Sequence, residues 1–96
     1  HNDTLGMIVQ LQDFFYNHHY SQCTLNKRKN LPMLAESLGV KGYAIEKPDD
    51  LIPVLKEAFA HKRPALVDIH ISPEERVYPT VPGGKALSDM ILGGDA

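Results

Sequence analysis

The chain has 96 residues and a formal net charge of −2, with 43% hydrophobic and 23% charged residues. This length allows one small domain at most, and the composition is that of an ordinary globular chain. The charge gives no electrostatic reason to expect nucleic acid or an anionic membrane as a partner. We also expect no membrane span and no signal peptide within these residues. Cys23 is the single cysteine, so it can form no internal disulfide, which fits a reducing compartment.

Apolar residues recur at helical spacing over residues 5–16, which predicts an amphipathic helix. We expect Asp3 or Thr4 to cap its first turn. The polar stretch 17–29 that follows is typical of an exposed loop. The expected buried face of the helix consists of Leu5, Ile8, Leu11, Phe14 and Phe15.

A second helix is expected to begin after Asn30, a good capping residue, with Pro32 in its first turn. Gly39 suits the left-handed conformation that often ends a helix. The apolar positions of this helix predict a buried face formed by Leu34, Leu38 and either Met33 or Ala35.

Two strands and a third helix follow. Residues 41–46 and 65–71 have the character of strands, and the second is rich in β-branched residues. Pro48 and the two aspartates after it begin the helix, and Pro53 limits how early it can start. Its expected buried positions are Leu51, Val54, Leu55, Ala58 and Phe59. A tail rich in proline and glycine then leads to a short amphipathic piece at 86–92.

The order helix, helix, strand, helix, strand places a βαβ unit at 41–71, which predicts parallel strands with a right-handed crossover. Two strands are too few for a complete sheet, and a parallel sheet needs cover on both faces. We therefore expect an α/β fold, the C-terminal half of a doubly wound parallel-sheet domain. In this interpretation the opening His-Asn-Asp is the exit of a preceding strand.

Ligands of such sheets bind at the carboxyl ends of the strands, beside helix N-termini. A helix N-terminus suits a phosphate or diphosphate, and the oxygens of an Asn side chain and a backbone carbonyl suit Mg²⁺. Gly6 allows a ligand to approach the backbone closely, and Met7 offers a flexible apolar contact. The same residues are equally typical of an ordinary helix cap, and spacing alone favours that simpler interpretation.

Two long segments carry more specific motifs: LGMIVQLQDFFYNHHYS at 5–21, and the stretch from LAESLGVKGYAIE at 34 to VYPTVPGG at 77–84. They resemble the LGMVxQWQxxFYxxRYS, LAEAxGVKG and V-Y-P-M-V-x-x-G patterns of the acetolactate synthase (acetohydroxyacid synthase) catalytic subunit family. The resemblance runs almost without gaps from residue 1 to about residue 91. Its specific parts are the first helix and VYPTVPGG, because the βαβ portion would fit any thiamine-diphosphate enzyme of this superfamily.

The resemblance implies a thiamine diphosphate site at the start of the chain. The family binds the diphosphate through a divalent metal, with a motif that begins Gly-Asp-Gly and ends Asn-Asn. Asn2 matches the last Asn, a ligand of Mg²⁺, and Thr4 matches the residue whose backbone carbonyl binds the metal. Leu5, Gly6 and Met7 match the turn that runs along the diphosphate towards the thiazolium.

Met7, Ile8 and Leu11 match positions that line the family's substrate channel. Leu11 stands where the family usually has Trp, which puts acceptor preference and inhibitor sensitivity in doubt. His1 replaces the usual first Asn of the motif, and His19 replaces the usual Arg before Tyr-Ser. The Gly-Asp-Gly half is not among these 96 residues. The glutamate that activates the cofactor, which a partner subunit supplies, is also not among them.

The resemblance implies acetolactate synthase chemistry, in which pyruvate is decarboxylated on thiamine diphosphate and its hydroxyethyl group condenses with pyruvate or 2-oxobutyrate. This reaction begins the biosynthesis of isoleucine, leucine and valine. It also implies a second large subunit in a homodimer or tetramer, a regulatory small subunit as a possible partner, and FAD bound, where present, by another domain. The alternatives are another thiamine-diphosphate carboligase or decarboxylase, such as glyoxylate carboligase, or a noncatalytic association module.

We expect residues 1–83 to belong to the cofactor-binding domain and residues 84–96 to form a C-terminal tail. The expected location is the cytoplasm of a bacterium or archaeon, or a plastid or mitochondrion in a eukaryote. The 96 residues alone are expected to be inactive.

The remaining polar residues give weaker signals. His18, His61 and His70 show no metal-ligand spacing with one another. Asp68 and His70 are expected on one strand face, with nothing nearby to complete a serine-type triad. The basic run 27–29 is typical of a solvated loop, although it could also meet a cofactor or a regulatory subunit. Cys23 has no base beside it in the sequence, so we expect it to be a bystander.

Overall fold

The structure is a computed structural model that describes residues 1–25 and 29–93. Its elements are α1 (Gly6–Phe15), α2 (Leu31–Ser37), β1 (Lys41–Ile45), η1 (Pro48–Asp50), α3 (Leu51–Ala60), β2 (Ala65–Ile69) and η2 (Leu87–Asp89). They fall into two compact units. We call residues 1–3 and 29–72 the sheet unit, and residues 4–25 and 73–93 the α1 unit. Within the described ranges, no helix has the length and apolar character needed to cross a membrane.

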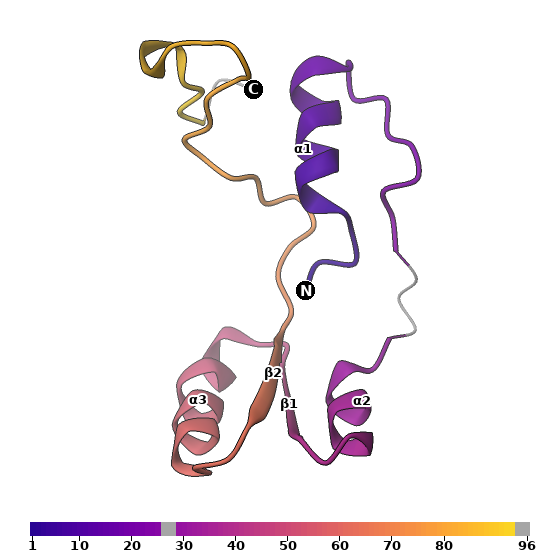
Figure 1. Ribbon diagram of the computed structural model, residues 1–96, viewed down its shortest axis with the longest axis vertical. Helices are drawn as coiled ribbons and strands as arrows, with labels where there is room; N and C mark the ends of the chain where they lie inside the picture. Colours follow the sequence, from indigo (N-terminus) through magenta and orange to yellow (C-terminus); the bar gives the residue numbers. More distant parts are fainter. Residues whose placement is uncertain (26–28, 94–96) are drawn as a thin grey trace. The chain divides into compact units, whose positions relative to one another are not determined.

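The sheet unit is built on β1 and β2, which pair in parallel from Lys41↔Ala65 to Ile45↔Ile69. Figure 1 shows α2 and α3 on opposite sides of this pair, so both faces of the small sheet are covered. Ile45 and Ala35 are the buried apolar side chains of this unit. The α/β fold and the parallel βαβ order predicted from the sequence are confirmed.

His1 lies beside the end of β2. Its backbone nitrogen donates to the carbonyl of Ile69 at 2.8 Å, and its own carbonyl accepts from the N–H of Ile71 at 3.0 Å. In a parallel ladder, the N–H and the C=O of one residue bond to the two residues that flank its partner on the other strand. Here those two residues are Ile69 and Ile71, which flank His70. His1 therefore pairs with residues 69–71 in the way that a residue of a neighbouring parallel strand would.

The predicted ends of α2 are confirmed. The Asn30 side-chain oxygen accepts from the N–H of Met33 at 2.9 Å, and Pro32 lies in the first turn. Gly39 has φ +77° and donates its N–H to the carbonyl of Glu36 at 3.0 Å. Asn30 therefore supplies the acceptor that the first turn of α2 lacks, and Gly39 supplies the left-handed residue that ends the helix.

Gly42 in β1 allows α2 to approach the sheet closely. A Cβ at this position would lie 2.4 Å from the carbonyl oxygen of Pro32 and 2.6 Å from its Cα. Both are backbone atoms, which cannot move aside without shifting the helix. Gly42 is thus required for the close packing of α2 on β1.

The predicted buried faces of α2 and α3 are partly wrong. Ala35 is buried, whereas Leu38 is 75% exposed and Phe59 is 83% exposed; Met33 and Leu34 are exposed too. Two strands are too narrow to cover a whole helix face, so only the residues directly over β1 and β2 are shielded. Of the predicted basic run, Lys29 is exposed; Lys27 and Arg28 lie outside the described residues.

The α1 unit corrects two further predictions. The residue at the N-cap of α1 is Leu5, without a side-chain cap, and neither Asp3 nor Thr4 takes that role. The buried residues of α1 are Val9 and Gln10, while most of the predicted apolar face is exposed, namely Leu5, Ile8, Leu11 and Phe15. The helix face that packs within this chain is therefore a different one from the most apolar face.

Candidate functional site

The segment that leads into α1 is fixed by backbone bonds to residues 23 and 24. The N–H of Leu5 donates to the carbonyl of Cys23 at 2.8 Å, and Thr4 forms an antiparallel bridge with Thr24. Because a trans peptide unit is planar, its C=O points opposite to its N–H. The carbonyl of Thr4, in the same peptide unit as the Leu5 N–H, is therefore directed away from Cys23.

The N-terminus of α1 is the place where the sequence predicts an anion. The carbonyl of Leu5 accepts from the N–H groups of Ile8 at 2.9 Å and Val9 at 3.0 Å, so the helix proper begins at Gly6. The first N–H groups of a helix have no acceptor within it, and the dipole there favours negative charge. In the sheet unit, the Asn2 side chain is half-buried. An amide oxygen and a backbone carbonyl oxygen are donors of the hard type that suits Mg²⁺.

The predicted channel residues lie on the exposed surface of α1. Met7, Ile8 and Leu11 are all exposed, and their spacing places them on one side of the helix. Ile8 and Leu11 line a hollow of about 440 Å³, which Met7 does not line. The other residues that line this hollow are Gln12, Phe15, Tyr16, Asn17 and His19. The structure therefore brings Leu11 and His19, two departures from the family pattern, into one hollow.

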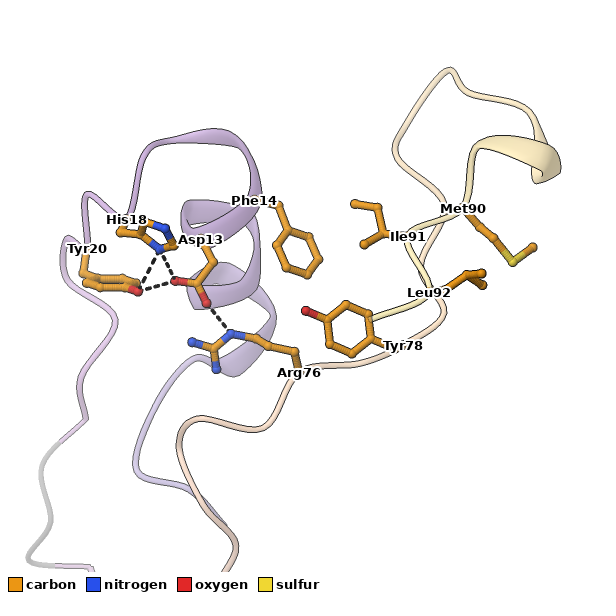
Figure 2. A pocket seen from close by; sticks show the side chains of 9 residues that line it. All are labelled: Asp13, Phe14, His18, Tyr20, Arg76, Tyr78, Met90, Ile91 and Leu92. Atoms are coloured by element: carbon orange, nitrogen blue, oxygen red, sulfur yellow. Dashed lines mark hydrogen bonds and ion pairs between the residues drawn. The ribbon is translucent and has the colours of Figure 1, made fainter. Parts of the chain in front are cut away.

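Asp13 is the centre of a polar cluster on another side of α1 (Figure 2). One carboxylate oxygen accepts from the Arg76 Nε. The other accepts from the Tyr20 hydroxyl and lies 3.2 Å from the His18 Nδ1. Arg76 also donates Nη1 to the carbonyls of Pro73 at 2.9 Å and Glu75 at 3.1 Å.

This cluster shifts two pKa values. Burial raises the pKa of Asp13, but hydrogen bonds from Tyr20, Arg76 and His18 outweigh it and lower that pKa to about 2. The hydrogen bond to Asp13, followed by burial, raises the pKa of Tyr20. Asp13 is therefore a permanent carboxylate at physiological pH, and it holds Arg76 as a structural cation.

Gln10 ties α1 to the segment that contains VYPTVPGG. Its side-chain oxygen accepts from the N–H of Val77 at 2.6 Å, and its Nε2 donates to the carbonyl of Val77 at 3.2 Å. Gln10 is only 3% exposed, so both of its polar atoms are satisfied away from water. The sequence gives no signal for Gln10, Asp13 and Arg76, because no local pattern connects residues more than 60 positions apart.

The Asp13 cluster lines one part of a pocket of about 680 Å³, and aromatic and apolar side chains line the rest. Phe14 stacks against Tyr78 with ring centroids 5.7 Å apart. Figure 2 shows Ile91 and Leu92 beside these two rings, with Asp13, His18 and Tyr20 on the other side of Phe14 and Arg76 next to Tyr78. A bridge between Thr80 and Ile91 joins the two ends of this C-terminal segment. The specific VYPTVPGG motif thus contributes Tyr78 to a pocket wall.

His1, in the sheet unit, lies among acidic groups. Its Nδ1 is 2.9 and 3.0 Å from the two carboxylate oxygens of Asp68, and its Nε2 is 3.0 Å from Asp3. The His70 Nε2 lies 3.2 Å from Asp68, which is only 5% exposed. Hydrogen bonds to Asp68 and then Asp3 raise the pKa of His1. Sequence spacing predicted the shared face of Asp68 and His70 but gave no signal for His1.

Comparison with known proteins gives a consistent result. Residues 1–69 match the family model described as thiamine pyrophosphate enzyme, C-terminal TPP binding domain. The chain is 42% identical over 95% of its length to an acetolactate synthase, mitochondrial, of Schizosaccharomyces pombe. It is 41% identical over 95% of its length to an acetolactate synthase large subunit of Haemophilus influenzae. It is also 40% identical over 94% to a probable acetolactate synthase large subunit of Methanocaldococcus jannaschii. The chain spans only 14% to 16% of these relatives.

Proposed function

Because the chain belongs to the family of C-terminal thiamine pyrophosphate-binding domains found in acetolactate synthases, we propose that it forms the last part of the cofactor-binding domain of an acetolactate synthase large subunit. The observation that carries this proposal is the match over 94% to 95% of the chain with relatives of that name from a yeast, a bacterium and an archaeon. The anion-binding geometry at the start of α1 supports it independently.

The reaction of the complete enzyme would be decarboxylation of pyruvate and condensation of the remaining two-carbon unit with pyruvate or 2-oxobutyrate. Bound thiamine diphosphate supplies the electron sink for carbon–carbon cleavage and formation. The residues of this chain bind and orient, and none of them needs to act as a general acid or base. Such a role fits a site built from an amide, a backbone carbonyl and a helix N-terminus.

The proposed metal ligands are Asn2, through its side-chain oxygen, and Thr4, through its backbone carbonyl. The direction of the Thr4 carbonyl, fixed by the Leu5–Cys23 bond, supports its role. Leu5, Gly6 and Met7 would run along the diphosphate, where the free N–H groups of the first turn of α1 face an anion. Mg²⁺ keeps several waters and shares phosphate oxygens, so it needs only a few protein ligands.

Met7, Ile8 and Leu11 would line the substrate channel. Their exposure on one side of α1 supports this role, since a channel wall must be free of packing within its own domain. The exposed apolar side chains of α1 also suit contact with the rest of a large subunit and with a second large subunit. FAD, where the enzyme uses it, would be bound by another domain, and a regulatory small subunit would be a further partner of the complete enzyme.

The location follows from the source of the chain. The relatives include an enzyme named as mitochondrial and large subunits from bacteria and archaea. We propose the cytoplasm for a bacterial or archaeal source and a mitochondrion or plastid for a eukaryotic one. The division between a cofactor-binding part at 1–83 and a tail at 84–96 remains a prediction.

The test uses the complete subunit that carries this sequence, assayed for acetolactate formation from pyruvate with saturating thiamine diphosphate and a series of Mg²⁺ concentrations from limiting to saturating. Asn2→Ala should lower activity at limiting Mg²⁺ at least about tenfold, because even an outer-shell partner of a metal is worth that much. Asp49→Ala, an exposed carboxylate in η1, is the matched control and should leave activity unchanged. An Asn2→Ala subunit with an unaltered Mg²⁺ requirement would remove Asn2 from the metal site.

The alternatives are separated in the same assay. Product formed from glyoxylate but not from pyruvate would indicate a different carboligase. A folded complete subunit that binds thiamine diphosphate but forms no product from either acid would indicate a noncatalytic module. The names of the relatives favour pyruvate as the substrate.

A further inference from the structure

We propose that His1, Asp68 and His70 form a site for a borderline divalent transition metal, of the class of Zn²⁺, at the end of β2. One ligand atom from each residue lies within 4.8 Å of the other two. The three residues belong to one compact unit, and the backbone bonds between His1 and β2 fix two of the three ligand positions. Two imidazoles and one carboxylate, with open positions for water, are a recurrent donor set for such metals.

The distances between the ligand atoms are close to those that a metal requires. The His1 Nδ1 lies 3.0 Å from Asp68 Oδ2, and the His70 Nε2 lies 3.2 Å from the same oxygen. Zinc binds nitrogen and carboxylate oxygen at about 2.0 to 2.2 Å, so two of its ligands can lie about 3 to 4 Å apart. The His70 side chain is 43% exposed, so its ring can rotate by the small amount that completes the site.

Asp3 supplies a second feature of a metal site. With a metal on the His1 Nδ1, the Nε2 carries the proton and donates to the Asp3 carboxylate, 3.0 Å away. Metal-binding histidines almost always donate their second N–H to a carboxylate, a carbonyl or water, which fixes the tautomer and the ring orientation. His1 thus has a ligand position on one side and an orienting carboxylate on the other.

The chemistry of the donors selects the metal. Imidazole nitrogen suits zinc, copper, nickel and iron, whereas Mg²⁺ prefers oxygen ligands and water. The buried Asp68 supplies the negative charge that a dication needs, and the exposed His70 leaves a path to solvent. Bound Zn²⁺ would link His1, and through it the neighbouring Asn2, to the end of β2.

The experiment titrates Zn²⁺ into the purified protein, without a histidine tag, by calorimetry and with Mg²⁺ in large excess. Co²⁺ absorption spectra report on the ligands of the same site. We expect one Zn²⁺ per chain with micromolar affinity that Mg²⁺ does not reduce. His70→Gln should weaken binding at least about tenfold, since losing a ligand costs no less than losing an outer-shell partner. His70 is exposed, so this variant should keep its fold, which circular dichroism checks.

Three further variants complete the design. Asp3→Asn keeps a residue that tolerates the positive φ of 55° and should weaken Zn²⁺ binding by about 10- to 100-fold. His61→Gln, an exposed histidine far along the sequence, should change nothing. Asp68→Asn should abolish Zn²⁺ binding. Like His70→Gln, it leaves His1 and its backbone bond to Ile69 in place. Absence of Zn²⁺ binding, or equal binding in His70→Gln and the unaltered protein, would overturn the proposal.

Discussion

Each of the two units is stabilised internally by a different kind of bond. The sheet unit rests on a parallel backbone ladder with helices on both faces, and its helix ends use Asn30 and Gly39. The α1 unit joins one helix to residues 73–93 through side chains, chiefly those of Gln10 and Asp13. The first kind of bond follows from local sequence patterns, whereas the second depends on single residues that pair over a long distance in the sequence. The α1 unit should therefore be the more sensitive of the two to single side-chain changes.

The largest effect is expected from Arg76→Met. It leaves the Asp13 carboxylate, whose side chain is 11% exposed, without its cationic partner. Removing one member of a buried ion pair typically costs about 3 to 5 kcal/mol, and the remaining bonds from Tyr20 and His18 place the expected loss at the lower end. Urea unfolding gives the free energy, and hydrogen exchange should show lost protection in the α1 unit alone. Arg63→Met, at an exposed position, is the control; equal losses in both variants would contradict a structural role for the Asp13–Arg76 pair.

A pH titration examines the same cluster without changing its shape. The pKa of Asp13 is about 2 in the folded protein against an ordinary value of 3.8, so this carboxylate stabilises the fold above pH 4. That contribution should be lost as the pH falls from about 4 to about 2, because protonation then favours the unfolded chain. The free energy of unfolding measured across this range should fall less steeply in Asp13→Asn than in the unaltered protein. If the free energy of unfolding fell equally steeply with pH in both proteins, groups other than Asp13 would cause the acid sensitivity.

Gly42→Ala tests the sheet unit in turn. The new Cβ would meet the Pro32 backbone at 2.4 Å, so α2 must shift away from β1. Overpacking of this kind typically costs about 1 to 3 kcal/mol, and hydrogen exchange should locate the loss in β1 and α2. Gly83→Ala is the matched control, because a Cβ there meets nothing within 4 Å. If Gly42→Ala were as stable as Gly83→Ala, α2 would be able to shift away from β1 with no loss in the free energy of unfolding.

The sequence predicted the order of the elements, the parallel pairing and both ends of α2, because each depends on residues within a few positions of one another. It predicted the wrong buried face for α1, since the buried Gln10 is hydrogen-bonded to Val77, 67 positions away. It predicts Asn2 to Met7 as a binding segment only through resemblance to a family, because an Asn before a helix is an ordinary cap. It gave no signal for His1 beside Asp68, since only the folded chain brings residues 67 positions apart together.

The smallest effect is expected from Asn30→Ala, which removes one side-chain acceptor at the start of α2. The Asn30 oxygen accepts from the N–H of Met33 at 2.9 Å, and loss of such a cap typically costs about 1 kcal/mol. Asn30→Asp keeps an acceptor in the same place and adds a negative charge at the helix N-terminus, so it should retain or slightly raise stability. Urea unfolding should therefore rank Asn30→Asp at or above the unaltered protein, with Asn30→Ala lowest. If the Asn30→Asp and Asn30→Ala variants lost equal stability, the cap would contribute little, and α2 would owe its position to its packing over Gly42.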